Sequence, residues 1–324
     1  MAGMELMTNF PKPVRAGGPN YDAAIIGGGP AGASCAVWLA RLGFSPVLLE
    51  GRDVLGGLCR VNPFLDEWNA SLPGMTGAQV ADNLALSLRR AGVPVYLSCT
   101  VQHVEAADGG FALTGSGLAE PLWASHLVLA TGVRARPLAP GMDGVPSGDA
   151  AAAAGRWTEG VLTGPGEHVV AQDFRGKRVA VLGGGDNAFE NALYALEKGA
   201  ASVRLYARNV RAQRQFVSKL PGDCVTLGPY SVDARARTVD GRAYDLIMVF
   251  YGWEPCVDFA DALGLQRGAQ GFIATDMRTA QTGCPGVYAI GEVAQRQHPC
   301  VVTALADGVA AAKAIQARIE ARAR

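Results

Sequence analysis

Short runs of consecutive apolar residues recur along the chain, and each is followed by glycine or by a polar turn. In the N-terminal part such runs occupy 21–26 and 46–51, and a helix-length segment at 33–43 lies between them. An unbroken apolar run of this length is typical of a parallel strand that is buried on both faces. Strand, glycine turn, helix and strand in close succession predict a βαβ unit with a right-handed crossover.

The same order of elements returns at 177–208. The first glycines of the two turns, Gly27 and Gly183, are 156 residues apart (183 − 27), too far for one βαβ unit to contain both. Further strand-like apolar runs, each ending in a turn, lie at 126–132, 244–255 and 285–293. The last segment, 303–324, predicts a helix. The expected fold class is α/β, with two separate nucleotide-binding units.

Proline and glycine mark the linking segments. Residues 1–20 contain several of both and predict a flexible lead without a regular element. Residues 134–148 are similarly rich in both and predict a crossing between domains. The alanine run at 151–155 is expected to be a spacer or a short helical turn.

Composition and charge narrow the class of partner. A chain of 324 residues is long enough for about two domains. The 29 Lys and Arg balance the 29 Asp and Glu, which gives no electrostatic reason to expect nucleic acid or an anionic membrane. The seven Cys are scattered and never spaced C-x-x-C, so neither a disulfide framework nor a metal site is indicated. Without a signal-like or membrane-spanning apolar segment, small-molecule chemistry in a reducing cytoplasm is expected.

The first glycine turn, GGGPAG, has the G-x-G-x-x-G spacing at Gly27, Gly29 and Gly32. In such a loop the first glycine permits the tight turn, the second lets a pyrophosphate approach the backbone, and the third allows close helix–strand packing. The phosphate is held at the helix N-terminus. Glu50 ends the next strand, where a carboxylate accepts from a ribose hydroxyl. The loop therefore predicts a dinucleotide site rather than a mere turn of the chain.

The second glycine turn, GGGDNA, has the same spacing at Gly183, Gly185 and Ala188. The strand that follows it ends without an acidic residue, and three arginines come next, at Arg208, Arg211 and Arg214. An acidic residue would repel a ribose 2′-phosphate, whereas an arginine pairs with it, so the pattern favours NADP over NAD. Arg208 is the first candidate, and the alternative is a solvated basic turn.

Together with these motifs, Gly56-Gly57, the ATG at 130–132 and PGVYAIGEV at 285–293 resemble the two-dinucleotide-domain flavoprotein reductases. Order and spacing are similar to those of the low-molecular-weight thioredoxin reductases. The resemblance implies two Rossmann-like three-layer domains, with an NAD(P)H domain at 136–252 inserted into a discontinuous FAD domain at 21–135 and 253–324. It also implies FAD contacts from Gly56, Gly57, Thr131, Gly132, Gly291 and Glu292.

Two positions depart from the family pattern. Glu292 stands where the family usually has an aspartate that holds the ribityl chain, although its carboxylate can accept the same hydroxyl. The segment GPGEHVVAQ at 164–172 stands where thioredoxin reductases carry a C-x-x-C pair, and there is no Cys from 100 to 223. The chain is thus similar to the ferredoxin or flavodoxin NADP reductases built on the same scaffold.

Several residues are candidates to replace the missing pair. His168 could donate a proton beside flavin N5, with Glu167 orienting it; the alternative is a surface loop that simply lacks cysteines. Cys59 and Cys300 align with flavin-contacting segments of the family and could form a redox pair, or each could be a small buried hydrophobe. Trp68 could cover a flavin face, or belong to a core or an interface.

The expected function is that of an FAD-dependent NADPH oxidoreductase, which passes a hydride from NADPH to FAD and then electrons to a small redox protein or a diffusible acceptor. Orientation of the two cofactors would supply most of the catalysis, with rotation of the NADPH domain about 133–140 and 252–256. The alternatives are a thiol oxidase or disulfide reductase acting on a small substrate, and a non-catalytic flavin-binding regulator. The resemblance also implies a homodimer.

Overall fold

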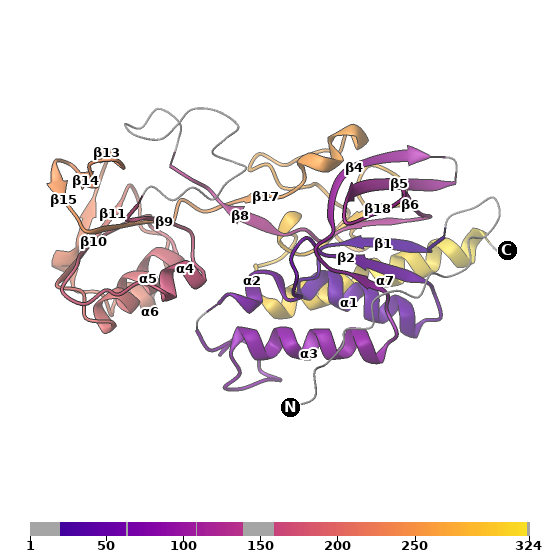
Figure 1. Cartoon of the computed structure of the whole chain (residues 1–324), viewed down its shortest axis with the longest axis horizontal. Helices are drawn as coiled ribbons and strands as arrows, with labels where there is room; N and C mark the ends of the chain where they lie inside the picture. The colour runs from indigo at the N-terminus through magenta and orange to yellow at the C-terminus, as the bar shows by residue number, and fades with distance from the viewer. Residues whose placement is uncertain (1–19, 63, 108, 139–158, 323–324) are drawn as a thin grey trace. The chain divides into compact units, whose positions relative to one another are not determined.

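The computed structural model describes residues 20–62, 64–107, 109–138 and 159–322, which Figure 1 draws in colour. The chain divides into two compact units. One comprises Met1–Val133 with Glu254–Arg324, and the other comprises Arg134–Trp253. The inserted unit begins two residues before, and ends one residue after, the predicted insertion at 136–252. The predicted lead at 1–20, apart from Asn20, and the alanine run at 151–155 lie outside the described residues.

The first unit is built on a five-stranded parallel sheet with the order β18-β7-β1-β2-β3. Its strands are β1 (Ala23–Ile26), β2 (Pro46–Leu49), β3 (Val95–Tyr96), β7 (Leu127–Leu129) and β18 (Val287–Ala289). In the central strand, Ile26 pairs with Leu49 on one side and with Leu129 on the other. Every residue of β1 and β2 is buried, as the unbroken apolar runs predict.

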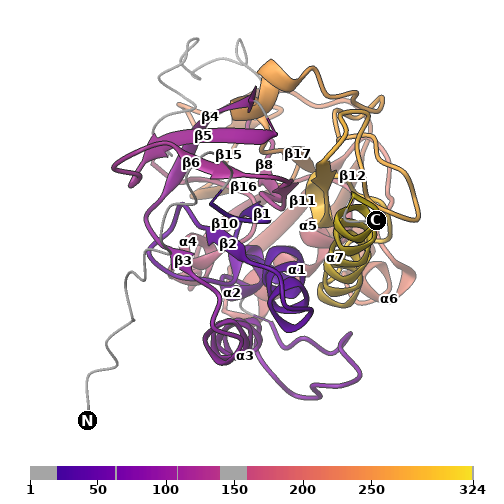
Figure 2. The same ribbon diagram turned by 90° about the vertical axis from the view of Figure 1, so that its right-hand side faces the viewer.

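Alternate residues of these strands face two different layers, which makes the first unit three layers deep. On one side Ile25 packs into a core with Leu39 and the helices α1 (Pro30–Arg41), α3 (Gly77–Arg90) and α7 (Val301–Arg322). On the other side Ile26 packs with Leu113 of the antiparallel strands β4 (Thr100–Ala107), β5 (Gly110–Ser116) and β6 (Leu122–Ala124). Figures 1 and 2 both show this sheet between the helices and the antiparallel layer.

The second unit repeats the plan with a parallel sheet in the order β12-β11-β10-β16-β9. Its strands are β9 (Val161–Thr163), β10 (Arg178–Leu182), β11 (Ser202–Ala207), β12 (Val225–Leu227) and β16 (Leu246–Val249). One face packs on α5 (Asp186–Glu197), and the other packs on the antiparallel strands β13 (Val232–Asp233), β14 (Thr238–Val239) and β15 (Arg242–Ala243). The fold class predicted from the sequence, α/β with parallel sheets in two Rossmann-like units, is confirmed.

The remaining elements are short. They are α2 (Gly57–Arg60), α4 (Glu167–Val170), α6 (Arg214–Val217), β8 (Val133–Ala135), β17 (Trp253–Pro255) and the 3₁₀ turns η1 (Gly222–Cys224), η2 (Asp258–Leu263) and η3 (Gly291–Val293). Strands β8 and β17, where the chain leaves and re-enters the first unit, pair with each other. Within the described ranges, no helix is long and apolar enough to cross a membrane.

Candidate cofactor-binding sites

The first glycine loop joins β1 to α1 and contains glycines of two kinds. A Cβ atom on Gly27, whose φ is +111°, would lie 2.3 Å from the Ala130 carbonyl oxygen, and one on Gly32 would lie 2.0 Å from the Gly27 oxygen. These two positions are therefore glycine because backbone packs on backbone. Gly29 has a φ of −73°, which any residue adopts, and the nearest atom to its Cβ position is 4.0 Å away. Open space at Gly29 is what a bound pyrophosphate requires.

Helix α1 starts with unsatisfied backbone donors beside that space. Pro30 is its first residue, and no side chain caps the helix. The N–H groups of the first turn of a helix have no intrahelical acceptor, and the helix dipole favours an anion there. The helix begins three residues before the predicted segment at 33–43, since proline fits the first helical position. The loop thus fits a dinucleotide phosphate.

Glu50 lies just after β2, almost fully buried at 9% exposure. Its Oε2 accepts from the Gly28 N–H at 2.7 Å, and its Oε1 accepts from the Arg52 N–H at 2.9 Å. Each carboxylate oxygen keeps a second lone pair for a ribose hydroxyl. Glu50 therefore also holds the glycine loop in shape, a role that the sequence motif alone did not reveal.

The glycine pair Gly56-Gly57 lies against this loop. Gly56 donates from its N–H to the Gly28 carbonyl oxygen at 2.9 Å, and a Cβ on Gly57 would lie 3.2 Å from the Gly29 Cα. The Thr131 hydroxyl donates to the Cys256 carbonyl oxygen at 2.6 Å, and its contact with FAD stays a prediction. Gly132 in turn accepts from the Cys256 N–H at 3.1 Å. Thr131 and Gly132 thus bond the segment that leads into β8 to the segment that follows β17.

The late turn η3 presents Gly291 and Glu292 at the start of α7. Burial raises the pKa of Glu292, and among the described residues no hydrogen bond to its carboxylate opposes that rise. A small cavity of about 10 Å³ lies beside it, lined in part by Arg296, Cys300 and Thr303. A partly buried carboxyl group in this position fits a flavin ribityl hydroxyl.

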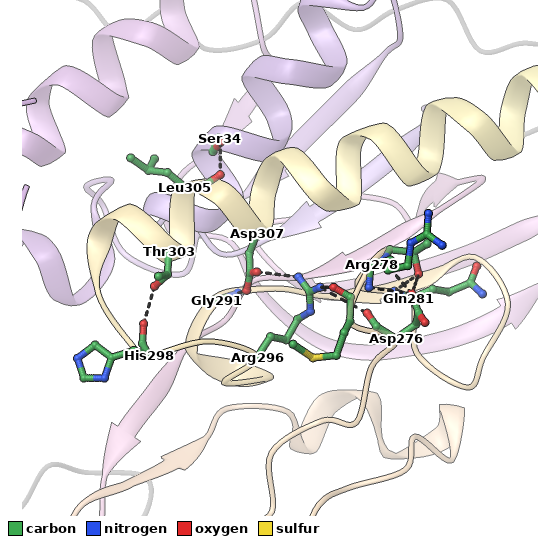
Figure 3. A network of polar contacts seen from close by, with 12 residues as sticks. Ser34, Asp276, Arg278, Gln281, Gly291, Arg296, His298, Thr303, Leu305 and Asp307 are labelled. Carbon is green, nitrogen blue, oxygen red and sulfur yellow. Dashed lines mark hydrogen bonds and ion pairs between the residues drawn. The ribbon is translucent and has the colours of Figure 1, made fainter.

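A buried polar network holds this turn, and Figure 3 shows it. Arg296 Nη1 lies 2.6 Å from Asp307 Oδ1, with side chains only 4% and 8% exposed. Asp307 Oδ2 accepts from the Gly291 N–H at 3.0 Å, and Arg296 Nη2 donates to the carbonyl oxygen of Met277. Burial raises the pKa of Asp307 and outweighs its bonds to Gly291 and Arg296, which lower that pKa. The network fastens η3 to α7 and to the turn that contains Met277.

The two candidate cysteines of this unit are each bonded locally. Cys59 Sγ donates to the Gly77 carbonyl oxygen at 3.3 Å, and burial raises the pKa of its thiol to about 11. Cys300 precedes α7, where its Sγ accepts from the Thr303 N–H at 3.5 Å. No disulfide joins any of the seven cysteines, all of which lie in the described part of the chain, so a redox role for Cys59 and Cys300 stays a prediction. Trp68 is 63% exposed and belongs to no core.

The second glycine loop joins β10 to α5 and has the same two kinds of glycine. A Cβ on Gly183, at a φ of +142°, would lie 2.4 Å from the Phe250 carbonyl oxygen. Gly185 has a φ of −96°, and no atom lies within 4 Å of its Cβ position. Ala188 is fully buried on α5, where it packs against the sheet. As in the first loop, no side chain caps the helix.

The arginine segment after β11 is fastened to this loop at two places. The N–H groups of Arg211 and Ala212 donate to the Gly184 carbonyl oxygen at 2.7 and 3.0 Å. Asp186, the first residue of α5, accepts from the Gln213 N–H at 2.7 Å and from its side-chain Nε2 at 2.9 Å. Arg208, Arg211 and Arg214 are exposed. Sequence reasoning missed Asp186 and Gln213, because their contact spans 27 residues.

His168 lies on α4 in the second unit, next to Glu167. Its Nε2 donates to the Gly164 carbonyl oxygen at 3.1 Å. Burial lowers the pKa of His168 below its ordinary value, despite this bond, which raises it. The imidazole is bonded within its own turn, and a proton-donating role stays a prediction.

Two parallel sheets, each with an open glycine and an uncapped helix at the carboxyl end of a central strand, define a protein with two dinucleotide-binding units. The chain belongs to the pyridine nucleotide-disulphide oxidoreductase family, which it matches over residues 21–224 and 228–308. It is therefore an oxidoreductase, and FAD and NADPH are the cofactors of these flavoenzymes.

Relatives that match most of the chain carry more than one name. The chain is 27% identical to thioredoxin reductase 1, mitochondrial, of Arabidopsis thaliana, over 90% of this chain and 82% of that protein. It is 28% identical to a ferredoxin–NADP reductase of Granulibacter bethesdensis, over 84% of this chain and 81% of that protein. Among solved structures, thioredoxin reductase of Lactococcus lactis matches with a TM-score of 0.74 and 25% identity, over 92% of this chain and 98% of that one.

Proposed function

We propose that this chain is an NADPH-dependent FAD reductase that delivers electrons to a small redox protein of the ferredoxin or flavodoxin kind, or to a diffusible acceptor. The observation that carries the proposal is the combination of two open glycine loops with a helix, α4, in the segment without cysteine. Both loops suit dinucleotides, whereas residues 164–172 offer no thiol to receive electrons.

In this proposal the first unit binds FAD. The uncapped start of α1 at Gly29 and Gly32 holds the pyrophosphate, and Glu50 accepts from the adenosine ribose. Glu292 accepts from the ribityl chain, and Gly291 is fixed by Asp307. FAD held by these residues would supply the chemistry of hydride acceptance and onward electron transfer. The other proposed FAD residues are Gly27, Gly56, Gly57 and Gly132, which shape the site through their backbone, and Thr131, whose hydroxyl bonds to the Cys256 carbonyl oxygen.

The second unit binds NADPH. Gly185 leaves room for the pyrophosphate at the start of α5, while Gly183 and Ala188 provide the close packing around it. Arg208 and Arg211 pair with the 2′-phosphate, because a guanidinium offers a planar set of donors to phosphate oxygens. This role selects NADPH over NADH.

The protonation of Cys59 argues against the alternative of a thiol oxidase or disulfide reductase. A thiolate is the reactive form of cysteine, and a pKa of about 11 keeps Cys59 protonated at pH 7. Relatives named ferredoxin–NADP reductase, found beside those named thioredoxin reductase, support a protein as the acceptor. A homodimer in the cytoplasm is part of the proposal, and size-exclusion chromatography with light scattering tests the dimer.

Anaerobic mixing of the yellow holoprotein with NADPH tests the proposal. The flavin absorbance should bleach rapidly, and subsequent addition of ferredoxin, flavodoxin or a quinone should restore it. The number of titratable thiols should be equal before and after reduction. Failure to bleach would support the non-catalytic regulator, and two additional thiols after reduction would establish an internal disulfide and the thiol alternative.

A further inference from the structure

The arginine segment that follows β11, residues 208–213, belongs to no helix or strand. Strand β11 ends at Ala207, α6 begins only at Arg214, and the side chains of Arg208 and Arg211 are exposed. Long exposed side chains on an irregular segment lose conformational entropy when they bind a phosphate. Whatever fixes the backbone of this segment before binding reduces that cost and increases affinity for the phosphate.

Two contacts fix that backbone to the glycine loop. The Gly184 carbonyl oxygen accepts the N–H groups of Arg211 and Ala212, so one end is held by backbone alone. The other end is held by side chains, since both carboxylate oxygens of Asp186 accept from Gln213, at 2.7 and 2.9 Å. The Cβ of any side chain at Gly184 would lie 1.9 Å from the Asn209 carbonyl oxygen, so the segment also packs directly on the loop.

We propose that Asp186 and Gln213 are positioning residues that set the selectivity for a ribose 2′-phosphate by holding Arg208 and Arg211 in place. The inference rests on the proposed function, because it requires the second unit to bind NADPH. Neither residue touches the 2′-phosphate; both act through the backbone of the arginine segment.

Asp186 could affect nucleotide binding through its charge or through its contact with Gln213, and the two effects can be told apart. A carboxylate in the first turn of α5 repels a dinucleotide pyrophosphate whether or not a 2′-phosphate is present. Loss of the charge alone should therefore tighten binding of both nucleotides, and it should not weaken the one that carries the 2′-phosphate relative to the other. Loss of the contact to Gln213 should weaken only the nucleotide that carries the 2′-phosphate.

Asp186→Ala, Asp186→Asn and Gln213→Ala separate these effects. Calorimetry of 2′,5′-ADP and 5′-AMP binding to the holoprotein measures how much the 2′-phosphate contributes to affinity. The ratio of kcat/KM for NADPH to kcat/KM for NADH measures the same preference during turnover. In Asp186→Ala the ratio of the two affinities should fall about tenfold. Asp186→Asn should not lower the ratio, since an amide can still accept the Gln213 N–H and bond to its side chain. Gln213→Ala should cause a smaller fall.

Asp173→Ala is the matched control, because Asp173 forms an exposed ion pair with Arg175 in the same unit, at 3.0 Å. It should leave the ratio unchanged. An Asp186→Ala ratio equal to the wild-type ratio overturns the positioning role and leaves the proposed function intact. Equal affinity of the wild type for 2′,5′-ADP and 5′-AMP overturns both the NADPH preference and this inference.

Discussion

Arg296 and Asp307 form an ion pair of 2.6 Å inside the first unit, and the same aspartate holds the Gly291 N–H at 3.0 Å. The pair links the turn that carries Glu292 to the first turns of α7. Removal of one partner of a buried ion pair leaves the other charge unpaired, which costs far more than the net contribution of the intact pair. The pair therefore controls both the stability of this region and the position of Glu292.

Arg296→Met should destabilise the protein by roughly 3–5 kcal/mol and lower the FAD content of the purified protein. Asp307→Asn should retain more FAD than Arg296→Met, because an amide oxygen still accepts the Gly291 N–H. The measurements are thermal unfolding and the ratio of flavin to protein absorbance.

The double variant Arg296→Met with Asp307→Leu serves as the control for charge. It should be less destabilised than Arg296→Met alone, since no unpaired charge is left behind. If the double variant loses as much stability as the two single changes added together, the explanation by an unpaired charge is wrong.

Gly29→Ala separates FAD binding from folding in the first unit. The φ of −73° suits alanine, and the nearest atom to the added methyl group is 4.0 Å away, so apoprotein stability should change by less than about 1 kcal/mol. FAD content should nevertheless fall at least about tenfold, since the methyl group occupies the place of the pyrophosphate. Gly27→Ala is the contrasting variant, because its methyl group would meet the Ala130 oxygen at 2.3 Å and destabilise the apoprotein as well. Normal FAD content in Gly29→Ala would contradict the assignment of the loop.

Gly185→Ala makes the corresponding test in the second unit. No atom lies within 4 Å of its Cβ position, so the fold should accept the change. FAD content and photochemical reduction of the flavin should match the wild type, while KM for NADPH rises at least about tenfold. Stopped-flow reduction at several NADPH concentrations measures this, and an unchanged concentration dependence would count against the second site.

The sequence predicted the parallel sheets well because buried strands need unbroken apolar runs, as in β1 and β10. It did not predict the antiparallel layer, since β4 reads TVQHVEAA, in which mostly polar residues surround two buried valines. Helix α3 begins with a signal that is local in the sequence, a capping box between Thr76 and Gln79.

The glycine loops of the candidate sites were predictable because their spacing is local, whereas their polar partners were not. Arg296 pairs with Asp307 across the turn between η3 and α7, and Asp186 reaches Gln213 from another element. Such pairs depend on how elements pack, and no periodicity in the sequence records them. Glu50 lies between these cases, since its position was predicted but its bond to Gly28 was not.

Glu190 provides a pH-dependent test of the second unit. It lies one turn after Asp186 on α5, and burial, reinforced by the charge of Asp186, raises the pKa of its carboxyl from 4.5 to about 7. The folded state therefore holds a proton that the unfolded state has already released between pH 4.5 and 7. This contribution to stability is complete below pH 4.5 and is lost as the pH rises through 7.

Glu190→Gln should remove this dependence, because glutamine stays neutral at every pH. The variant and the wild type should unfold at similar temperatures at pH 5, and at pH 8 the variant should be more stable by on the order of 1–2 kcal/mol. Thermal unfolding from pH 5 to 8 measures the difference between the two proteins, which cancels the contribution of other titrating groups. Asp186→Asn should lower the pH at which this stability is lost. The substitution removes the charge repulsion that, together with burial, raises the pKa of Glu190. A constant difference across this range would show that Glu190 is ionised in the folded protein throughout.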